Sequence, residues 1–500
     1  MPAGGDDDPR FGFLSAADYA TARALLTAAG YAEKAIFEMV GLSADSLPRD
    51  GGALLALGEA ERGSSLETLI LLFLIGAPVE ADRARQALQP MDAGEWAEAG
   101  LIAVEGNLVR GLVRLVPFRG LWLAHDRPEQ KQRADFVMGV GSSTVRLMDV
   151  AIRRPVRAML DLGSGCGTQG LFAARHSDRV VATDTNPRAV QFTHFNAQIN
   201  DLRKVETIGG DLLEPVADRK FDLVLSNPPF VISPDRRYIY RDGGLPGDGF
   251  CRRLIREVPA VLEEGGYCQI LCNWAHQRRE AWQDRLSGWF EGTGCDAWVM
   301  RTETEEVAAY ATTWIRQTEP DDPARLGETY ERWLEYYDRQ GIESISTGII
   351  TMRRSSGRSN WIRIDEIPPR ILGPCGDDIE LGFALRDFLE TVGDEAGLLE
   401  IRPRVSPVAR LHQRLAPAAG VWESEEMELR REQGLAAAAR VDQYVAGLVG
   451  RCDGRRTLRD LIHELAVALG RDPNEVAGPM LAIVRRLIEQ AILLPEGVFG

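Results

Sequence analysis

Three acidic residues in this chain each follow a short apolar run, and glycines surround the first of them. Asp161 ends the run that begins at Val156 and opens the sequence Asp-Leu-Gly-Ser-Gly-Cys-Gly, Asp184 ends a second run, and Asp211 follows a third run and two glycines. Glycines let a ligand approach the backbone closely. A carboxylate about 20 positions after such a turn can accept from both hydroxyls of a ribose, and Asp211 can accept from an adenine amine. The pattern indicates a site for a nucleoside-containing ligand.

The glycine turn alone leaves several classes open, because dinucleotide enzymes, methyltransferases and some purely structural turns all use one. About sixty residues further on, the apolar run at 221–226 ends directly in Asn227-Pro228-Pro229-Phe230. Two prolines straight after a strand form a rigid, non-helical loop with no spare backbone donors. This loop distinguishes among the classes that the glycine turn leaves open.

With these elements in this order, residues 136–356 resemble the class I S-adenosylmethionine-dependent methyltransferases of the amino-methylating branch. The Asn-Pro-Pro-aromatic sequence is shared by release-factor glutamine methyltransferases, by ribosomal-RNA methyltransferases acting on the exocyclic amine of guanine, and by adenine-amine methyltransferases of DNA and RNA. A nicotinamide-binding Rossmann domain and an inactive scaffold on a methyltransferase core are the alternatives.

The resemblance implies that S-adenosylmethionine is the cofactor and S-adenosylhomocysteine the product. It places the glycine turn around the methionine moiety, Asp184 on the ribose, and Asp211 with Leu212 beside the adenine. The cofactor-binding residues that it implies are Asp161, Gly163, Ser164, Gly165, Gly167, Asp184, Thr185, Asn186, Asp211, Leu212 and Asn227.

The same resemblance implies that Asn227, Pro228, Pro229 and Phe230 form the catalytic loop. An amide or ring-conjugated amine is a poor nucleophile because its lone pair is delocalised. The Asn227 side-chain oxygen and the Pro228 carbonyl would accept its two N–H protons, and Phe230 would stack on the planar group. Catalysis would then rest on orientation and electrostatic preorganisation, without a metal.

The stretch that follows, residues 231–250, is rich in glycine and proline and carries two tyrosines and several arginines. Its composition favours a mobile lid, and its place after the catalytic loop sets it against the substrate. The substrate-binding residues expected here, together with Phe230, are Tyr238, Tyr240, Arg241 and Asp248.

The elements that must position these residues form an α/β domain over residues 131–356 with a Rossmann-like, seven-stranded sheet. Strands are expected at 156–160, 179–183, 205–208, 221–226, 266–272, 296–302 and 344–352. Helices are expected between them, including one at 276–289 just after Asn273-Trp274 at the end of the fifth strand. A helical insertion at about 305–339 carries aromatic residues at helical spacing, which either pack a core or set substrate specificity.

Residues 1–130 precede this domain and form a helical, winged-helix-like domain. Capping boxes at Ser15 and Ser64 open helices, and a Pro/Gly-rich break interrupts them at 46–52. β-rich runs after Gly100 predict a small hairpin. Its second helical region is no more basic than its surroundings, which favours packing or substrate positioning over nucleic-acid contact.

Residues 357–500 form a mostly helical C-terminal domain. Thr457 and Asp460 make a capping box, Asp472-Pro473 opens another helix, and a short apolar strand follows at 492–494. This ending loosely resembles small winged-helix modules, whereas a dimerisation or packing role is the simpler reading, so a homodimer is possible.

The composition of the chain limits the classes of partner that we expect. A net charge of −16 with 26% charged residues argues against sequence-independent binding to the phosphates of a nucleic acid. Neither a targeting segment nor an apolar run of membrane-spanning length is present, and seven scattered cysteines fit reduced thiols. We therefore expect a cytoplasmic N-methyltransferase without a metal or a membrane partner. A protein, peptide or small-molecule substrate is favoured, and an RNA base, ribosomal or transfer, is the alternative.

Overall fold

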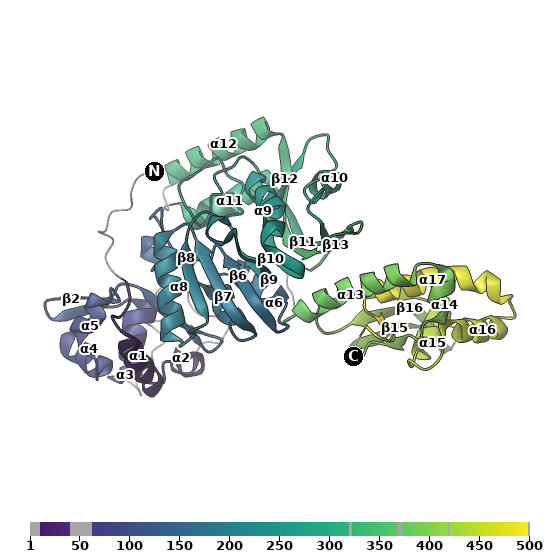
Figure 1. The fold of residues 1–500 in the computed structure, drawn as a ribbon, viewed down its shortest axis with the longest axis horizontal. Coiled ribbons are helices and arrows are strands. Elements are labelled where there is room, and N and C mark those ends of the chain that lie inside the picture. Colours follow the sequence, from purple (N-terminus) through teal and green to yellow (C-terminus); the bar gives the residue numbers. More distant parts are fainter. Residues whose placement is uncertain (1–10, 41–62, 320–322, 369–372, 419, 499–500) are drawn as a thin grey trace. The chain divides into compact units, whose positions relative to one another are not determined.

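The computed structural model describes residues 11–40, 63–319, 323–368, 373–418 and 420–498 (Figure 1). These residues divide into two compact units. The first contains Met1–Leu147 and Pro155–Glu366, and the second contains Met148–Arg154 and Ile367–Gly500. The break expected at 46–52 lies outside the described residues. The first unit carries every residue of the expected site.

A mixed eight-stranded sheet forms the centre of the first unit, in the order β13-β11-β12-β10-β9-β6-β7-β8. Its strands are β6 (Val156–Leu162), β7 (Ser177–Asp184), β8 (Val205–Gly209), β9 (Phe221–Ser226), β10 (Leu262–Gln277), β11 (Cys295–Glu306), β12 (Ile342–Arg354) and β13 (Ile362–Glu366). Strands β6 to β10 pair in parallel, and β12 is antiparallel to both of its neighbours. The expected Rossmann-like α/β fold is confirmed, and β13 adds an eighth strand at the edge beside β11.

Helices connect the parallel strands, as the doubly wound pattern predicts (Figure 1). They are α7 (Thr168–Ala173), α8 (Pro187–Ile199), α9 (Gly249–Glu257) and α10 (Trp282–Ser287), with short 3-10 turns at Glu214–Val216 and Val258–Val261, while α6 (Ser142–Val150) precedes the first strand, β6.

The helix expected at 276–289 is wrong in its first part. β10 continues to Gln277 because it pairs with β12 from Tyr267 to the strand's end. Asn273 and Trp274 therefore lie inside the strand, both almost fully buried, and not at its end. Only α10 remains helical in this stretch.

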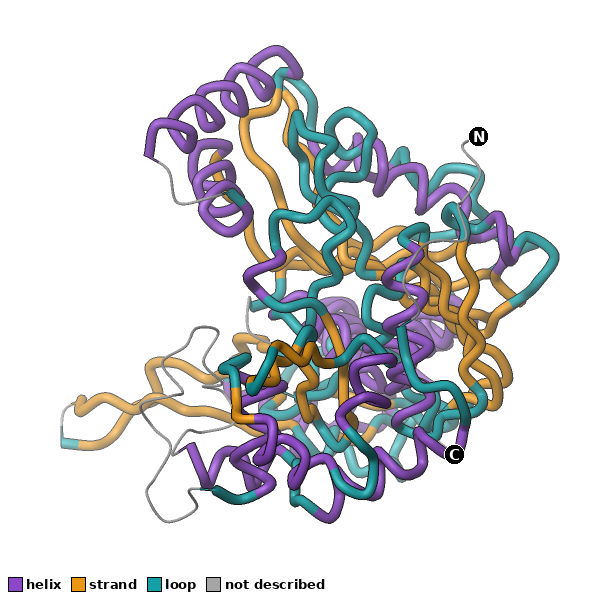
Figure 2. The backbone as a smooth tube through the Cα atoms, turned by 90° about the vertical axis from the view of Figure 1, so that its left-hand side faces the viewer, coloured by secondary structure: helices purple, strands orange, loops and turns teal. Residues whose placement is uncertain are grey.

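The insertion consists of two helices, α11 (Val307–Thr318) and α12 (Pro323–Gln340), which lie side by side (Figure 2). Tyr310, Trp333 and Tyr337 are at most 1% exposed and share one apolar cluster with Val231 and Ile232 of the loop after β9. Most of the aromatic pattern therefore serves packing, and this packing attaches the loop to the insertion.

The N-terminal part of the first unit is helical and then β-rich, in agreement with the sequence. Its elements are α1 (Ala16–Ala28), α2 (Glu33–Val40), α3 (Ser65–Leu69), a π-helical turn (Ile70–Ile75), β1 (Val79–Glu80), α4 (Ala81–Leu88), α5 (Ala93–Glu98), β2 (Ile102–Glu105), β3 (Leu108–Gly111), β4 (Arg114–Phe118), β5 (Leu121–His125) and a 3-10 turn (Pro128–Gln130). Ser15 accepts from the Asp18 backbone N–H, as the capping box requires. The comparison with a winged helix stays a prediction.

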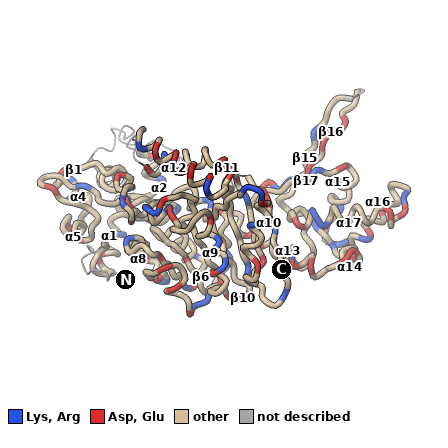
Figure 3. The backbone as a smooth tube through the Cα atoms, turned by 90° about the horizontal axis from the view of Figure 1, so that it is seen from above, with Lys and Arg blue, Asp and Glu red and all other residues tan. Residues whose placement is uncertain are grey.

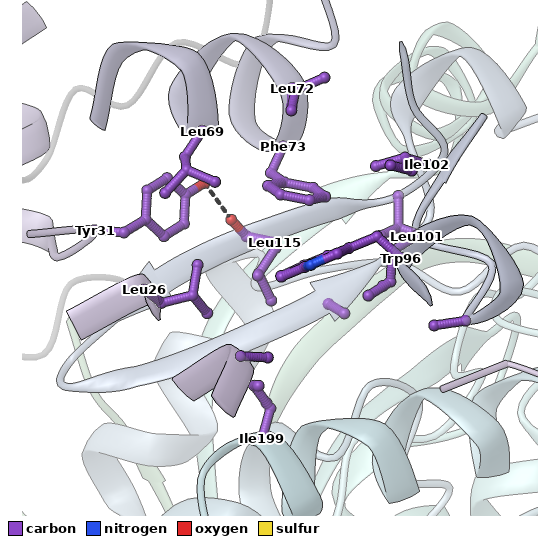
Figure 4. Packing of buried hydrophobic residues seen from close by; sticks show 14 of the residues in the cluster. Leu26, Tyr31, Leu69, Leu72, Phe73, Trp96, Leu101, Ile102, Leu115 and Ile199 are labelled. Atoms are coloured by element: carbon purple, nitrogen blue, oxygen red, sulfur yellow. Dashed lines mark hydrogen bonds between the residues drawn. The ribbon is translucent and has the colours of Figure 1, made fainter. Parts of the chain in front are cut away.

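One apolar cluster joins this part to the central sheet's helix α8 (Figure 4). Leu26, Phe73, Trp96 and Leu115 lie at its centre, and Ile199 enters from α8. The buried Tyr31 hydroxyl donates to the Leu115 carbonyl across 2.7 Å, so its polar end is satisfied.

Asn196 of α8 and Asn200, the C-cap residue of this helix, also bind the edge of β5. The Asn196 amide pairs with both backbone groups of Ala124, at 2.6 and 2.9 Å. The Asn200 amide does the same with Trp122, at 2.9 and 2.7 Å. Side chains four residues apart on a helix lie on one face, and alternate residues of a strand point their backbone groups to one side. These two side chains therefore supply the hydrogen-bond partners that a neighbouring strand would give to the backbone of β5.

The second unit contains helices and a three-stranded antiparallel sheet. Its elements are α13 (Gly376–Val392), α14 (Glu395–Glu400), β14 (Arg404–Val405), β15 (Ala409–Ala418), β16 (Val421–Arg431), β17 (Ala438–Val441), α15 (Gln443–Gly450), α16 (Leu458–Leu469), α17 (Pro473–Glu489) and β18 (Leu493–Leu494). Thr457 caps α16 as predicted, while the long hairpin of β15 and β16 was not foreseen (Figure 3). Among the helices described in either unit, none has the length and apolar character to cross a bilayer.

Candidate functional site

The sheet register brings the expected site residues to one edge. Leu162 at the end of β6 pairs with Thr183 of β7 on one side and with Ser226 of β9 on the other. The next residue along each of the three strands therefore lies at the carboxyl edge of the sheet, where ligands bind in open α/β sheets. These residues are Gly163, Asp184 and Asn227.

The glycine turn is held by the neighbouring strand. The backbone N–H groups of Gly163 and Ser164 both donate to the Thr183 carbonyl at 2.9 Å, and the Gly165 N–H donates to the Asp184 carboxylate at 2.9 Å. Gly163 and Gly165 have φ values of +73° and +57°, and a Cβ added to either would meet no atom within 4 Å. The turn therefore leaves open space beside its backbone.

Gly167 is glycine for a different reason. Its φ is +84°, and an added Cβ would lie 2.8 Å from the methyl carbon of Thr193 on α8. The Thr193 hydroxyl in turn donates to the Gly165 carbonyl at 3.0 Å and lies 3.2 Å from the Ser164 hydroxyl. Thr193 thus fixes the turn from behind, a role that sequence reasoning missed.

Asp161 is buried beneath this turn. Its side chain accepts from the Gly170 N–H at 2.8 Å, and only 1% of the residue is exposed. Burial raises the pKa of the Asp161 carboxyl to about 7, with the nearby Asp184 charge adding to the shift. Burial also raises the pKa of Asp184, although its bonds to backbone N–H groups oppose that shift. Two carboxylates in a desolvated site favour a cationic ligand.

The remaining expected cofactor residues lie along the same edge. Asn186 caps α8 and donates to the Asp135 carbonyl at 2.9 Å, while Thr185 beside it is exposed. Asp211 follows β8 with 54% of its side chain exposed, 3.9 Å from Arg253. Leu212 next to it has a φ of +44°.

The Asn227 loop begins where β9 ends. The Asn227 side-chain nitrogen donates to the Ser143 hydroxyl of α6 at 3.3 Å. Pro228 is buried, and Phe230 is half-buried with its ring 6.0 Å from Trp314 of α11 in an edge-to-face arrangement. Ser143 was not singled out from the sequence, and the hydroxyls after the glycines at 139 and 141 were its only signal.

Ion pairs and hydrogen bonds of charged side chains fix the loop that follows Phe230. The Arg241 guanidinium donates to Asp242 at 2.7 Å, to Asp235 at 3.1 Å and to the Thr318 hydroxyl of α11 at 2.6 Å, with no side-chain surface exposed. The guanidinium also lies over the Tyr238 ring, 4.8 Å from its centre. Arg241 and Tyr238 therefore anchor the loop to the insertion.

The other two expected substrate contacts differ in their surroundings. Tyr240 is half-buried between Phe136 and Tyr238, and burial raises its pKa to about 12. Asp248 is 5% exposed, accepts from the Ala275 N–H at 2.9 Å and pairs with Arg285 at 2.6 Å. A substrate contact by any of these residues stays a prediction.

No group of three His, Cys, Asp or Glu side chains among the described residues is arranged to hold a metal ion. The seven cysteines are all buried and unpaired with one another.

Three stretches of the chain match known families. Residues 139–292 match the model of the methyltransferase small domain, which is the stretch that contains the glycine turn and the Asn227 loop. Residues 28–112 and 380–495 match two models described as domains of unknown function.

Curated relatives are similar to about a quarter of the chain. A release factor glutamine methyltransferase of Geobacter sulfurreducens is 32% identical over 25% of this chain and 49% of its own. A putative protein N5-glutamine methyltransferase of Methanocaldococcus jannaschii is 33% identical over 23% of this chain and 60% of its own. A ribosomal RNA small subunit methyltransferase C of Alcanivorax borkumensis is 34% identical over 23% of this chain and 32% of its own.

This chain thus spans about half the length of the release factor relative. Residues 139–292 are therefore similar to the methyltransferase small domain, in agreement with the class I branch that the sequence resembles.

Proposed function

We propose that this protein is an S-adenosylmethionine-dependent N-methyltransferase that acts on a planar side-chain amide of a protein or peptide. The observation that carries the proposal is the position of Asn227. This residue directly follows β9, and Gly163 directly follows the neighbouring strand β6. Two of the relatives are named as glutamine methyltransferases, and glutamine carries such an amide.

The residues at the strand edge fit the proposed cofactor. Gly163 and Gly165 leave room beside their backbone, as a close ligand requires. Each carboxylate oxygen has two acceptor positions, so Asp184 can accept from ribose hydroxyls in addition to the Gly165 and Asn186 N–H groups. Asp161 provides negative charge near the turn. When bound, S-adenosylmethionine supplies a methyl group activated by a sulfonium.

The chain's own groups would orient the substrate nitrogen. The Asn227 nitrogen already donates to Ser143, which leaves the side-chain oxygen to accept from a substrate N–H. The Pro228 carbonyl is the second acceptor, and the Phe230 ring can lie against the planar amide. Hydrogen bonds from both N–H groups of the amide to these two acceptors increase the electron density on its nitrogen. Such fixed acceptors cost no reorganisation during the reaction.

The test is methyl transfer from radiolabelled S-adenosylmethionine into separated protein, RNA and small-molecule fractions of a cell extract. We expect label in protein, released as methylamine by acid hydrolysis, since hydrolysis of an N-methylated amide frees the amine. The variant Asn227→Ala, at equal concentration, is the control for contaminating activities.

Two other outcomes would change the proposal. Label confined to RNA would assign a base amine, which is the activity that the name of the Alcanivorax relative suggests. Label confined to oxygen atoms would contradict the role of Asn227. Failure to bind S-adenosylmethionine in a calorimetric titration would contradict the enzyme assignment itself.

A further inference from the structure

A cavity of about 400 Å³ lies between the loop after Phe230 and the two insertion helices. Four arginines and three carboxylates line it, with one threonine. The lining residues are Asp235, Arg236, Arg237, Glu319, Arg325, Glu328, Thr329 and Arg332. Nothing assigned so far to the strand edge uses this cavity.

Two of the carboxylates are already engaged beneath the arginines. The Asp235 carboxylate accepts from the Trp333 indole at 3.0 Å and from Arg241 at 3.1 Å, and only 14% of its side chain is exposed. Glu319 is 6% exposed and accepts from Arg237 at 3.4 Å. Their lone pairs are therefore directed to groups inside the protein.

The guanidinium groups are the more accessible part of the lining. Arg237 and Arg332 have 38% and 48% of their side chains exposed, although they pair with Glu319 and Asp235, and Arg236 is exposed as well. The buried Arg241 is paired with Asp242 and Asp235, whose charges raise its pKa against the effect of burial. Charges of both signs are spread over the described residues (Figure 3), and the full sequence has a net charge of −16. The cavity thus presents exposed guanidiniums in an acidic protein.

The cavity lies close to the proposed catalytic loop. Phe230 contacts Trp314 on α11, and Glu319 at the cavity directly follows the same helix. Five residues of helix rise about 7.5 Å. An extended peptide covers that distance with two or three residues, at about 3.3 Å each.

We propose that this cavity binds the carboxylate of an acidic residue two or three positions from the methylated amide in the substrate. The proposal rests on the proposed function, because it names a recognition element of that substrate. Guanidinium groups pair with carboxylates through charge-assisted hydrogen bonds. We favour a peptide carboxylate over a nucleic-acid phosphate as the occupant because the proposed function acts on a peptide amide and the lining, which includes the exposed Glu328, carries both signs of charge.

The test measures binding directly with fluorescently labelled probes on the full-length protein. The probes are hexaglutamate, hexaglutamine and a uridine hexanucleotide, at low salt because exposed charges are screened by ions. We expect hexaglutamate to bind at least fivefold more tightly than hexaglutamine. Arg236→Gln should raise the hexaglutamate dissociation constant about threefold, and Arg236→Glu at least tenfold.

The matched control is Arg203→Gln, which removes an exposed charge outside the cavity lining, a few residues after α8, with 85% of its side chain in solvent. It should leave hexaglutamate binding unchanged. The proposal is overturned if both Arg236 variants bind like the wild type, or if hexaglutamate binds no better than hexaglutamine. Tighter binding of the hexanucleotide that is lost in Arg236→Glu would assign the cavity to phosphates and also overturn it.

Calorimetric titration with S-adenosylmethionine in the same proteins separates this proposal from the proposed function. Cofactor binding without hexaglutamate binding would overturn the cavity assignment alone. Hexaglutamate binding without cofactor binding would overturn the methyltransferase proposal and leave an anion-binding cavity.

Discussion

The Asn227 side-chain nitrogen donates to the Ser143 hydroxyl across 3.3 Å, so the first turn of α6 determines which way this amide points. An asparagine amide has one donating and one accepting end. Because the donating end is engaged, the oxygen is the end left for a substrate N–H.

Replacing Ser143 with Ala should therefore lower kcat about tenfold with little change in KM, because the Asn227 amide can then rotate. This magnitude corresponds to one modest hydrogen bond. Ser143→Thr, which keeps the hydroxyl, should restore most of the rate. Ser142→Ala, at the exposed neighbouring position, is the control. Equal kcat for Ser143→Ala and the wild type would contradict the positioning role.

Replacing Asn227 with Ala removes the acceptor itself. We expect kcat to fall on the order of 10²-fold or more, as for other preorganised groups, while the dissociation constant of S-adenosylmethionine changes less than about threefold. Single-turnover methylation and calorimetry provide the two measurements. Asn474→Ala, at an exposed position in the second unit, should match the wild type in both. A fully active Asn227→Ala protein would remove this residue from the mechanism.

The glycines of the turn should respond differently to an added methyl group. Gly167→Ala places a Cβ against Thr193 at a φ of +84°, so thermal unfolding should show a loss of more than about 2 kcal/mol in folding free energy. Gly163→Ala meets no protein atom and should lose only about 1 kcal/mol from its backbone conformation. Its larger defect should be in cofactor affinity. The reverse order of unfolding temperatures would refute this distinction.

Cofactor affinity should depend on pH through Asp161, whose pKa burial raises to about 7. A cation favours the ionised carboxyl, so below pH 7 a proton must be lost before the cationic cofactor binds. Affinity should thus fall by up to about tenfold for each pH unit between 7 and 5. The ligand-free protein should show the opposite trend, since a raised acid pKa makes the folded state bind more protons and gain stability as the pH falls.

Calorimetric titrations at pH 8, 7, 6 and 5 check this dependence. Asp161→Asn keeps an acceptor for the Gly170 N–H but cannot ionise, so its affinity should be lower at pH 8 and nearly flat with pH. A wild-type affinity that does not change over this range would show that Asp161 does not carry the charge that the cofactor meets.

Arg241 should contribute mainly to stability. Its guanidinium is unexposed and paired with Asp235 and Asp242, and removing one member of a buried ion network costs about 3 kcal/mol or more. Arg241→Met should lower the free energy of unfolding by that amount in chemical denaturation. Arg252→Met, at an exposed position of α9, is the control. Unchanged stability in Arg241→Met together with a raised substrate KM would instead support the substrate contact that the sequence predicts.

The sequence predicts the strand edge well because its signals are local. Apolar runs, the glycine turn and the two prolines each determine structure within a few residues, and the parallel order then brings Asp184 and Asn227 together. Long-range pairing is less visible. Asn273 and His276 are polar, which suggests the end of a strand, yet β12 pairs with β10 across both of them.

Side-chain environment is also hard to predict from residue type. An arginine in a loop after a catalytic motif suggests substrate contact, but Arg241 finds Thr318 on α11, which is 77 residues away in the chain. The partner of Ser143 is 84 residues away and that of Thr193 is 28 residues away. Such contacts exist only once the sheet has set the spacing of the helices.

Asn196 links two regions that the chain order keeps apart. Its amide nitrogen donates to the Ala124 carbonyl of β5 at 2.9 Å and to the Cys166 carbonyl of the glycine turn at 2.8 Å. The same side chain thus contacts the glycine turn and the β4–β5 hairpin. If binding at one of these places changes the affinity at the other, the effect is reciprocal. A ligand of residues 121–125 that displaces Asn196 would change the affinity of the turn for a nucleoside, and binding at the turn would change the affinity for that ligand by the same factor.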